Sequence, residues 1–382
     1  MAPISHPPSP NSYFDANATT PLLPVAREAW LEASERYWQN PSSPHPGGSE
    51  ARRQLDDARE RLADILGCEP ETLIFTSGAT ESNNAVFAHY AKALTGDETV
   101  VISPLEHPSV NLAAKMHLGN RLRKGRAKSS GVVDIKSIFE KQSGESVKLV
   151  SVMAANHETG VLQPWQAILE QCRDLGTCYH CDATQWLGKL PADSLGECDW
   201  LTGSAHKFGG PKGVGFLKVP SSKTPLRMQW GGRQEDGKRA GTENLPGILA
   251  MLAALEWQEA HLKEDLEERK SARLAFEKEL ADKLPGAVVI GHGEARLDNT
   301  VMLLLPPPQG NLKWVARLGR LGFAVSTGSA CTAGRSDPSL VLEAMGYSYE
   351  DMGRALRLSA LWDTSLSDWM ELLEALATIS RD

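Results

Sequence analysis

The sequence predicts an α/β fold in which a mostly parallel, doubly wound sheet forms a large domain and a smaller α+β domain follows it. Two observations favour this fold. From about residue 70, short apolar runs alternate with amphipathic stretches, which is the pattern of parallel strands covered by helices on both faces. The chain also has 382 residues, more than one hydrophobic core usually serves, so two domains are expected.

The strands of the large domain are expected where short apolar runs are bounded by polar or glycine-containing turns. These runs lie at 71–77, 98–103, 147–155, 177–183 and 198–204. Helices are expected between the strands, where apolar residues recur at helical spacing. These helical stretches lie at 79–94, 107–117 and 164–176.

A long helical stretch from about 245 to 283 connects the two predicted domains. It begins apolar and becomes charged, as expected of a helix that leaves one domain for another. The segments that predict the small domain lie at 287–292, 299–305, 312–322, 355–361 and 367–379. The expected boundaries are an N-terminal arm at 1–12, a large domain at 13–258 and a small domain at 259–382.

The composition is that of a soluble globular enzyme, with 41% hydrophobic and 23% charged residues. The net charge of -8 argues against a nucleic-acid partner, because such proteins need a surface that neutralises phosphates. One basic run, at 121–128, is expected to be a solvated strand or loop edge.

The amino terminus does not predict membrane association. Its first twelve residues are rich in Pro and Ser and have neither the basic start nor the apolar core of a signal peptide. No stretch has the apolar length that a bilayer-spanning helix needs. Six cysteines in a chain of this length do not suggest a disulfide framework, so a reducing cytoplasm is expected.

Cys178 and Cys181 form a C-x-x-C spacing that occurs in zinc and redox sites. They fall, however, in the strand expected at 177–183. Positions three apart in a strand point to opposite faces of the sheet, so the two thiols would diverge. We expect both to be core residues.

Three polar features follow predicted strands, where ligands bind in open α/β sheets. The first is "FTSGATESNN", in which Gly78, Ala79 and Thr80 open a helix and offer backbone N–H groups to an anion. The alternative is an ordinary strand-to-helix turn. The segment has neither the lysine of a P-loop nor a G-x-G-x-x-G pattern.

The second feature is Asp182 and the third is "GSAHKFGGPKGVG", which contains Lys207. Asp182 is either a helix cap or a carboxylate paired with a cationic ring nitrogen, as beneath pyridoxal 5′-phosphate (PLP). Lys207 is a candidate for a Schiff base, with Ser204 and His206 as possible phosphate ligands. The alternative for Lys207 is a surface lysine beside a glycine-rich hairpin.

Nine segments and a short "RLS" after them, in this order along the chain, resemble PLP-dependent cysteine desulfurases of the class V aminotransferase family, which have fold type I. The segments are "YFDANATTP", "NPSSPHPGG", "FTSGATESNN", "EHPSV", "NHETG", "HCDATQ", "GSAHKFGGPKGVG", "GGRQEDGKRAGTEN" and "STGSACT" with the later "RLS". The resemblance covers nearly the whole chain and implies that PLP is the cofactor.

The resemblance implies a role for each matching residue around the cofactor. Lys207 would bind PLP covalently and later move the α-proton of the substrate, Asp182 would pair with the pyridine nitrogen, and Gln185 would contact the ring hydroxyl. His107 would stack on the ring. The residues that would hold the phosphate are Ala79, Thr80, Ser204 and His206.

The resemblance also implies a homodimer and a substrate site. Thr242 would reach the phosphate of the neighbouring subunit, with the sites at the dimer interface. Asn156 and Arg357 would hold the substrate carboxylate, since the guanidinium fork matches two carboxylate oxygens. The alternative for Arg357 is a surface ion pair.

Cys331 lies in "STGSACT", among small residues that offer little apolar packing. In the family this cysteine takes the sulfur of L-cysteine as a persulfide and L-alanine is released, which requires a thiolate. The loop length resembles the branch with the longer catalytic loop, and a sulfur-acceptor protein, for iron–sulfur clusters or other thio-compounds, is an expected partner. The alternative is a thiol with only a packing role.

The chain departs from the family pattern at His157, where a second asparagine is usual, and at Leu361 and Trp362, which follow "RLS". These departures leave the pocket wall and the substrate preference open. The rival activities are a selenocysteine lyase or a cysteine β-lyase. A non-catalytic PLP-holding scaffold is a third alternative. It predicts that Lys207 or Asp182 is replaced by another residue type, but both are present.

Overall fold

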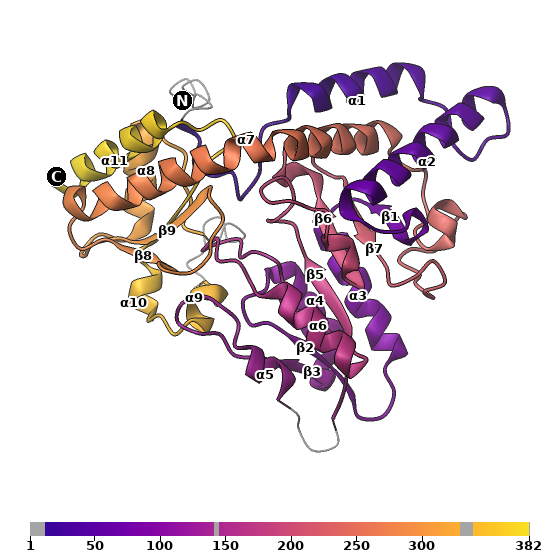
Figure 1. Ribbon diagram of the computed structural model, residues 1–382, viewed down its shortest axis with the longest axis horizontal. Coiled ribbons are helices and arrows are strands. Elements are labelled where there is room, and N and C mark those ends of the chain that lie inside the picture. The colour runs from indigo at the N-terminus through magenta and orange to yellow at the C-terminus, as the bar shows by residue number, and fades with distance from the viewer. Residues whose placement is uncertain (1–11, 141–144, 329–338, 382) are drawn as a thin grey trace, which may run out of the picture.

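A computed structural model describes residues 12–140, 145–328 and 339–381, with the side chains of 263–265 excepted (Figure 1). Its large sheet has seven strands in the order β1-β7-β6-β5-β4-β2-β3. The strands are β1 Leu73–Thr76, β2 Glu98–Ile102, β3 Leu122–Lys124, β4 Ser146–Ser151, β5 Cys178–Asp182, β6 Trp200–Ser204 and β7 Gly215–Lys218. Strands β3, β2, β4, β5 and β6 run parallel, and β7 runs antiparallel to both of its neighbours. The mostly parallel sheet is therefore confirmed.

Helices cover both faces of this sheet, so the doubly wound arrangement is also confirmed. Val100 and Ile102 of β2 pack with α3 and α4 on one face, whereas Val101 packs with α2, α6 and the start of α7 on the other. This division follows from the alternation of side chains along a strand. The helices are α1 Pro24–Arg36, α2 Pro46–Leu66, α3 Ala79–Ala93, α4 Pro108–Leu118, α5 Ile135–Phe139, α6 Trp165–Leu175 and α7 Leu245–Lys283.

The second sheet is small and antiparallel, with the order β10-β9-β8. Its strands are β8 Val288–Ile290, β9 Thr300–Leu304 and β10 Ala355–Ser359, and the helices beside them are α8 Asn311–Arg320, α9 Leu340–Ala344, α10 Tyr349–Met352 and α11 Leu366–Arg381. The long helix α7 runs along both parts of the molecule (Figure 1). Leu252 of α7 packs in the core of the large sheet and Phe276 in the core of the small one. The exact domain boundaries stay a prediction.

The chain before α1 crosses from the small sheet to the large one. Phe14 is fully buried in the core of the small sheet, and Tyr13 and Asp15 pair with Ala324 and Ser359. This pairing fixes the direction of the next residues, which reach the carboxyl ends of the large strands. Residues far apart in sequence therefore meet at one place.

The expectations for the C-x-x-C spacing and the basic run agree with the structure. Cys181 packs in the core on one face of the sheet, and Cys178 packs against the core on the other face. Both are free thiols. The basic run begins at the edge strand β3, where Arg123 pairs with Glu145 at 3.0 Å. Within the described residues, no helix is long and apolar enough to cross a membrane.

Candidate active site

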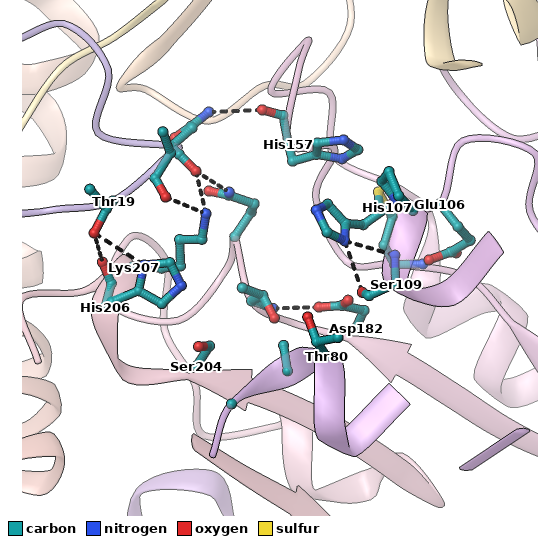
Figure 2. A pocket seen from close by; sticks show the side chains of 18 of the residues that line it. Thr19, Thr80, Glu106, His107, Ser109, His157, Asp182, Ser204, His206 and Lys207 are labelled. Carbon is teal, nitrogen blue, oxygen red and sulfur yellow. Dashed lines mark hydrogen bonds between the residues drawn. The ribbon is translucent and has the colours of Figure 1, made fainter. Parts of the chain in front are cut away.

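A cavity of about 980 Å³ lies at the carboxyl ends of β1, β4, β5 and β6, between the large sheet and the small domain (Figure 2). The three strand-end features that the sequence singled out all line it. Residues 17–19 and Gly328 line it as well. The predicted site residues that line this cavity are Ala79, Thr80, His107, Asp182, Gln185, Ser204, His206, Lys207 and Arg357.

Lys207 ends a short 3₁₀ helix, Ala205–Lys207, that follows β6 directly. Its Nζ donates hydrogen bonds to the main-chain oxygens of Asn17, at 2.6 Å, and Ala18, at 2.8 Å. These bonds hold the amine at the cavity, as Figure 2 shows. The alternative of an exposed surface lysine is therefore excluded.

Asp182 is the last residue of β5, and its side chain faces the cavity. Asn83 Nδ2 donates to one carboxylate oxygen at 2.9 Å, and the Thr184 N–H donates to the other at 3.0 Å. The side chain is only 5% exposed. A buried carboxylate held in this way is suited to a cationic partner in the cavity.

An uncapped helix start borders the cavity beside Ser204. Gly78 precedes α3 with a φ of +138°, and no side chain caps the helix. A Cβ at Gly78 would lie 3.2 Å from Ser204 Oγ, and a Cβ at Gly215 would lie 2.6 Å from the Gly78 Cα. Glycine thus brings two backbones close together and leaves the first N–H groups of α3 available to an anion.

Two histidines lie edge to face at the cavity, His107 and His157, with ring centroids 5.0 Å apart. His107 caps α4, and its Nδ1 accepts a hydrogen bond from the Ser109 N–H at 3.1 Å. Burial lowers the pKa of His107, an effect that Lys207 adds to and Asp182 opposes. Burial also lowers the pKa of His157 well below its usual value, with further lowering by His107 and Arg357. In both residues burial therefore favours the neutral imidazole over the charged form.

His206 forms the cavity wall on the side of Lys207. Its Nδ1 lies 3.1 Å from Thr19 Oγ1. Burial, followed by the charge of Lys207, lowers the pKa of His206 to about 4. A neutral imidazole here can still donate one hydrogen bond to an anion.

Arg357 lies in the middle of β10 and is 2% exposed. Its Nη2 donates to Asp15 Oδ1 at 2.7 Å, and its Nη1 donates to the main-chain oxygens of His157 at 3.0 Å and Gly328 at 3.2 Å. The alternative of a surface ion pair is excluded by this burial. The guanidinium is instead fixed at the edge of the cavity.

The sequence reasoning missed two buried acids that line the cavity, Glu106 and Glu158. Burial raises the pKa of each carboxyl group, and the raised value at Glu106 also reflects the charge of Asp182. Glu106 accepts a hydrogen bond from the Met153 N–H at 2.7 Å. Glu106 directly precedes His107 in "EHPSV", and Glu158 directly follows His157 in "NHETG". This position beside a residue already singled out was the signal available in the sequence.

A family model described as "Aminotransferase class-V" matches residues 12–368. The chain belongs to the class-V aminotransferase family. A cysteine desulfurase of Klebsiella pneumoniae is 39% identical over 353 residues, which are 91% of this chain and 87% of that protein.

Two solved structures of this class-V aminotransferase fold are also similar. A "NifS-like protein" superposes with a TM-score of 0.88 at 30% identity, over 97% of this chain and 99% of that one. The structure of "SspA in complex with cysteine" superposes with a TM-score of 0.78 at 28% identity, over 91% and 98% of the two chains. The fold is thus that of the PLP enzymes of fold type I.

The class-V aminotransferase family depends on PLP in general, and the residues of the cavity fit this cofactor. The uncapped start of α3 and the glycine-lined contact at Gly78 suit a phosphate. Asp182 suits a pyridine nitrogen that carries a proton, and the amine of Lys207 lies at the same cavity.

Three predicted site residues are not among the described residues that line the cavity. The Asn156 carboxamide oxygen accepts from the N–H groups of Glu158 and Thr159, and its Nδ2 donates to the Leu105 carbonyl. The side chain is therefore bonded to main-chain groups of its own turn and of Leu105. Thr242 is exposed and precedes α7. Cys331 lies outside the described residues.

The two unusual residues after "RLS" do not form the cavity wall of this class-V aminotransferase. Neither Leu361 nor Trp362 is among the described residues that line the cavity. Leu361 is 3% exposed, and Trp362 packs edge to face on Trp257, with ring centroids 6.1 Å apart. A Cβ at Gly209 would lie 3.3 Å from the Trp362 ring. Trp362 therefore packs between α7 and the segment that follows Lys207.

Proposed function

We propose that this chain is a cysteine desulfurase that converts L-cysteine to L-alanine and leaves the sulfur on Cys331. One observation carries the proposal: Lys207, Arg357 and Gly328 line the same cavity. Cys331 follows Gly328 by three residues in the sequence. Leu340, beyond Cys331, lines the cavity as well.

The residues of the cavity divide into those that hold PLP and those that act on the substrate. PLP, when bound, withdraws electrons from the substrate carbon that loses its proton. Asp182 pairs with the ring nitrogen, Gln185 contacts the ring hydroxyl and His107 stacks on the ring. The phosphate ligands are Ala79, Thr80, Ser204 and His206. Lys207 holds the cofactor covalently, and its amine then accepts the α-proton of L-cysteine.

The Arg357 guanidinium binds the carboxylate of L-cysteine. Asp15 and two main-chain oxygens already fix its orientation, so little rotamer freedom is lost when the substrate binds. His157 lines the cavity and Asn156 does not. We therefore assign the second contact with the substrate to His157 in place of Asn156.

The sulfur transfer balances within the chain and the substrate. The thiolate of Cys331 attacks the sulfur of L-cysteine, so an S–S bond forms while the Cβ–S bond breaks. The electron pair of the broken bond stays with the substrate carbon, which gains a proton and leaves as L-alanine. The Cys331 sulfur is oxidised to the persulfide and the substrate Cβ is reduced, so no other redox partner is required.

The proposal extends to a homodimer and to a sulfur acceptor. Thr242 is exposed and outside the cavity, which suits a residue that reaches the phosphate of a neighbouring subunit. The five cysteines that the structure describes are all free thiols, as expected of a protein in the reducing cytoplasm. A persulfide at Cys331 needs an acceptor protein to complete the cycle.

Replacement of Asp15 by asparagine is expected to raise the KM for L-cysteine about tenfold with little change in kcat. The change weakens the bond that orients Arg357. Because Arg357 holds the substrate carboxylate equally in the ground state and in the transition state, binding of L-cysteine is weakened while the chemical step is not. Steady-state kinetics of alanine formation measure both constants. Asp351→Asn weakens a similar contact with Arg354, away from the residues that line the cavity, and should change neither constant. An unchanged KM in Asp15→Asn would contradict this role of Arg357.

The product of the reaction tests the proposed function against its rivals. Purified protein supplied with PLP, L-cysteine and a reducing thiol is expected to release alanine. Pyruvate and ammonia as the main products would instead identify a cysteine β-lyase. A strong preference for selenocysteine, with no dependence on Cys331, would identify a selenocysteine lyase. Protein that takes up no PLP would overturn the enzyme proposal altogether.

A further inference from the structure

A second amine, that of the partly buried Lys189, lies behind the cavity wall. Its Nζ donates hydrogen bonds to Gln185 Oε1 and, at 3.2 Å, to Asn17 Oδ1. Both acceptors are carboxamide oxygens, and among the described residues no carboxylate forms an ion pair with this amine. Burial lowers the pKa of Lys189 well below its usual value, and Lys207 and Arg357 lower it further. Taking an amine out of water costs free energy, so its position here needs a physical reason.

The contact with Lys189 determines which way the carboxamide of Gln185 points. One end of a carboxamide only accepts hydrogen bonds and the other end only donates them. The oxygen end faces Lys189 Nζ, which donates to it, and the main-chain oxygen of Asn17, which can only accept, excludes the reverse orientation. The amino end of Gln185 then donates to the Asn17 main-chain oxygen at 2.9 Å and keeps one further N–H.

Asn17 joins this pair to the amine of Lys207. Its main-chain oxygen accepts from both Gln185 Nε2 and Lys207 Nζ, and its side-chain oxygen accepts from Lys189. Asn17 is itself 1% exposed and is held by Thr300, whose Oγ1 accepts from its Nδ2 at 2.9 Å. The orientation of Gln185 is therefore fixed at both ends.

We propose that Lys189 is a positioning residue, which fixes Gln185 so that an N–H, and not the carboxamide oxygen, faces a ligand in the cavity. This inference rests on the proposed function, in which Gln185 contacts the ring hydroxyl of PLP. An N–H stabilises the anionic form of that oxygen, whereas a rotated carboxamide would bring two oxygens together. Lys189 acts only through Gln185 and does not line the cavity.

A double-mutant cycle of Lys189→Met and Gln185→Leu tests the proposal. Methionine keeps much of the length of the side chain but cannot donate. Each single variant is expected to bind PLP about tenfold more weakly, the effect of one lost hydrogen bond to a charged group. The pH midpoint of the bound cofactor's absorbance should rise in both, because the anionic oxygen loses a donor. The double variant should be no worse than Gln185→Leu alone.

Several outcomes would overturn the inference. Additive losses in the double variant would show that Lys189 acts without Gln185. A lower unfolding temperature of Lys189→Met with unchanged PLP binding and an unchanged midpoint would show a purely structural role. If Lys189→Met fails to fold, Lys189→Gln, which keeps a donor, takes its place and should retain the wild-type midpoint. A shifted midpoint in that variant would contradict the proposal.

Two controls separate this inference from the proposed function. Lys92→Met removes an exposed amine of α3 and should leave PLP binding and the midpoint unchanged. If the wild-type protein itself does not bind PLP, the proposed function is wrong. If the wild type binds PLP normally and Lys189→Met behaves like the wild type, only the proposed role of Lys189 is wrong.

Discussion

Replacement of Cys331 by serine is expected to reduce alanine formation from L-cysteine by about a thousandfold or more. A hydroxyl is almost entirely protonated at pH 7 and is a far weaker nucleophile toward sulfur than a thiolate. The cofactor ligands Asp182 and Lys207 are unchanged, so PLP binding and its absorbance should be those of the wild type. Amino-acid analysis of the product and absorbance spectra of the protein measure the two properties.

A second cysteine provides the matched control for this experiment. Cys68 is a partly buried free thiol, and burial raises its pKa, so it is a poor nucleophile at pH 7. Cys68→Ser should therefore keep alanine formation close to the wild-type rate. Normal turnover in Cys331→Ser would refute sulfur transfer to this residue, and a loss in both variants would point to an effect on folding.

Replacement of Lys207 by alanine is expected to abolish the covalent attachment of PLP and to lower the reaction rate by at least about a thousandfold. The variant removes both the amine that holds the cofactor and the base that accepts the α-proton. The main-chain oxygens of Asn17 and Ala18 would also each lose one hydrogen-bond donor. Asp182 and the start of α3 remain, so weak, non-covalent binding of PLP should persist.

Borohydride reduction followed by peptide mapping measures this attachment. In the wild type the cofactor should be fixed to the peptide that contains Lys207. Lys212 is the matched control because it lines the same cavity but is exposed, and Lys212→Ala should retain the label at Lys207. Label found on Lys189 or Lys212 in the wild-type protein would contradict the assignment.

The sequence predicted β1, β2, β4, β5 and β6 because each is a short apolar run with polar residues at its end. It did not predict β7, and the basic run that holds β3 was expected only as a strand or loop edge. The strand ends in turn predicted the site, since parallel strands bring Asp182, Ser204 and the start of α3 to one edge. Helix α1 was not predicted. Its buried residues are only Ala26 and Ala33, and this gives a weak pattern. Helix α2 has buried Ala51, Leu55, Ala58 and Leu62 at helical spacing, a signal that was available.

The parts of the site that the sequence could not supply depend on turn geometry and on main-chain atoms. Asn156 and His157 are adjacent, and only the fold of the turn decides which of them faces the cavity. Asn17 contacts Gln185 and Lys207 through its main-chain oxygen, and such a contact does not depend on the identity of the residue. Lys189 contacts Gln185 because the turn after β5 brings them together, and neither composition nor spacing indicates this contact.

The most direct measurement of the central claim is a single turnover of L-cysteine by the PLP-loaded protein, with the sulfur then located by alkylation and peptide mass analysis. The account predicts one alanine for each sulfur added, with that sulfur on the peptide that contains Cys331 and none on the other cysteines. Alanine formed without sulfur on Cys331, or sulfur released together with pyruvate, would contradict it.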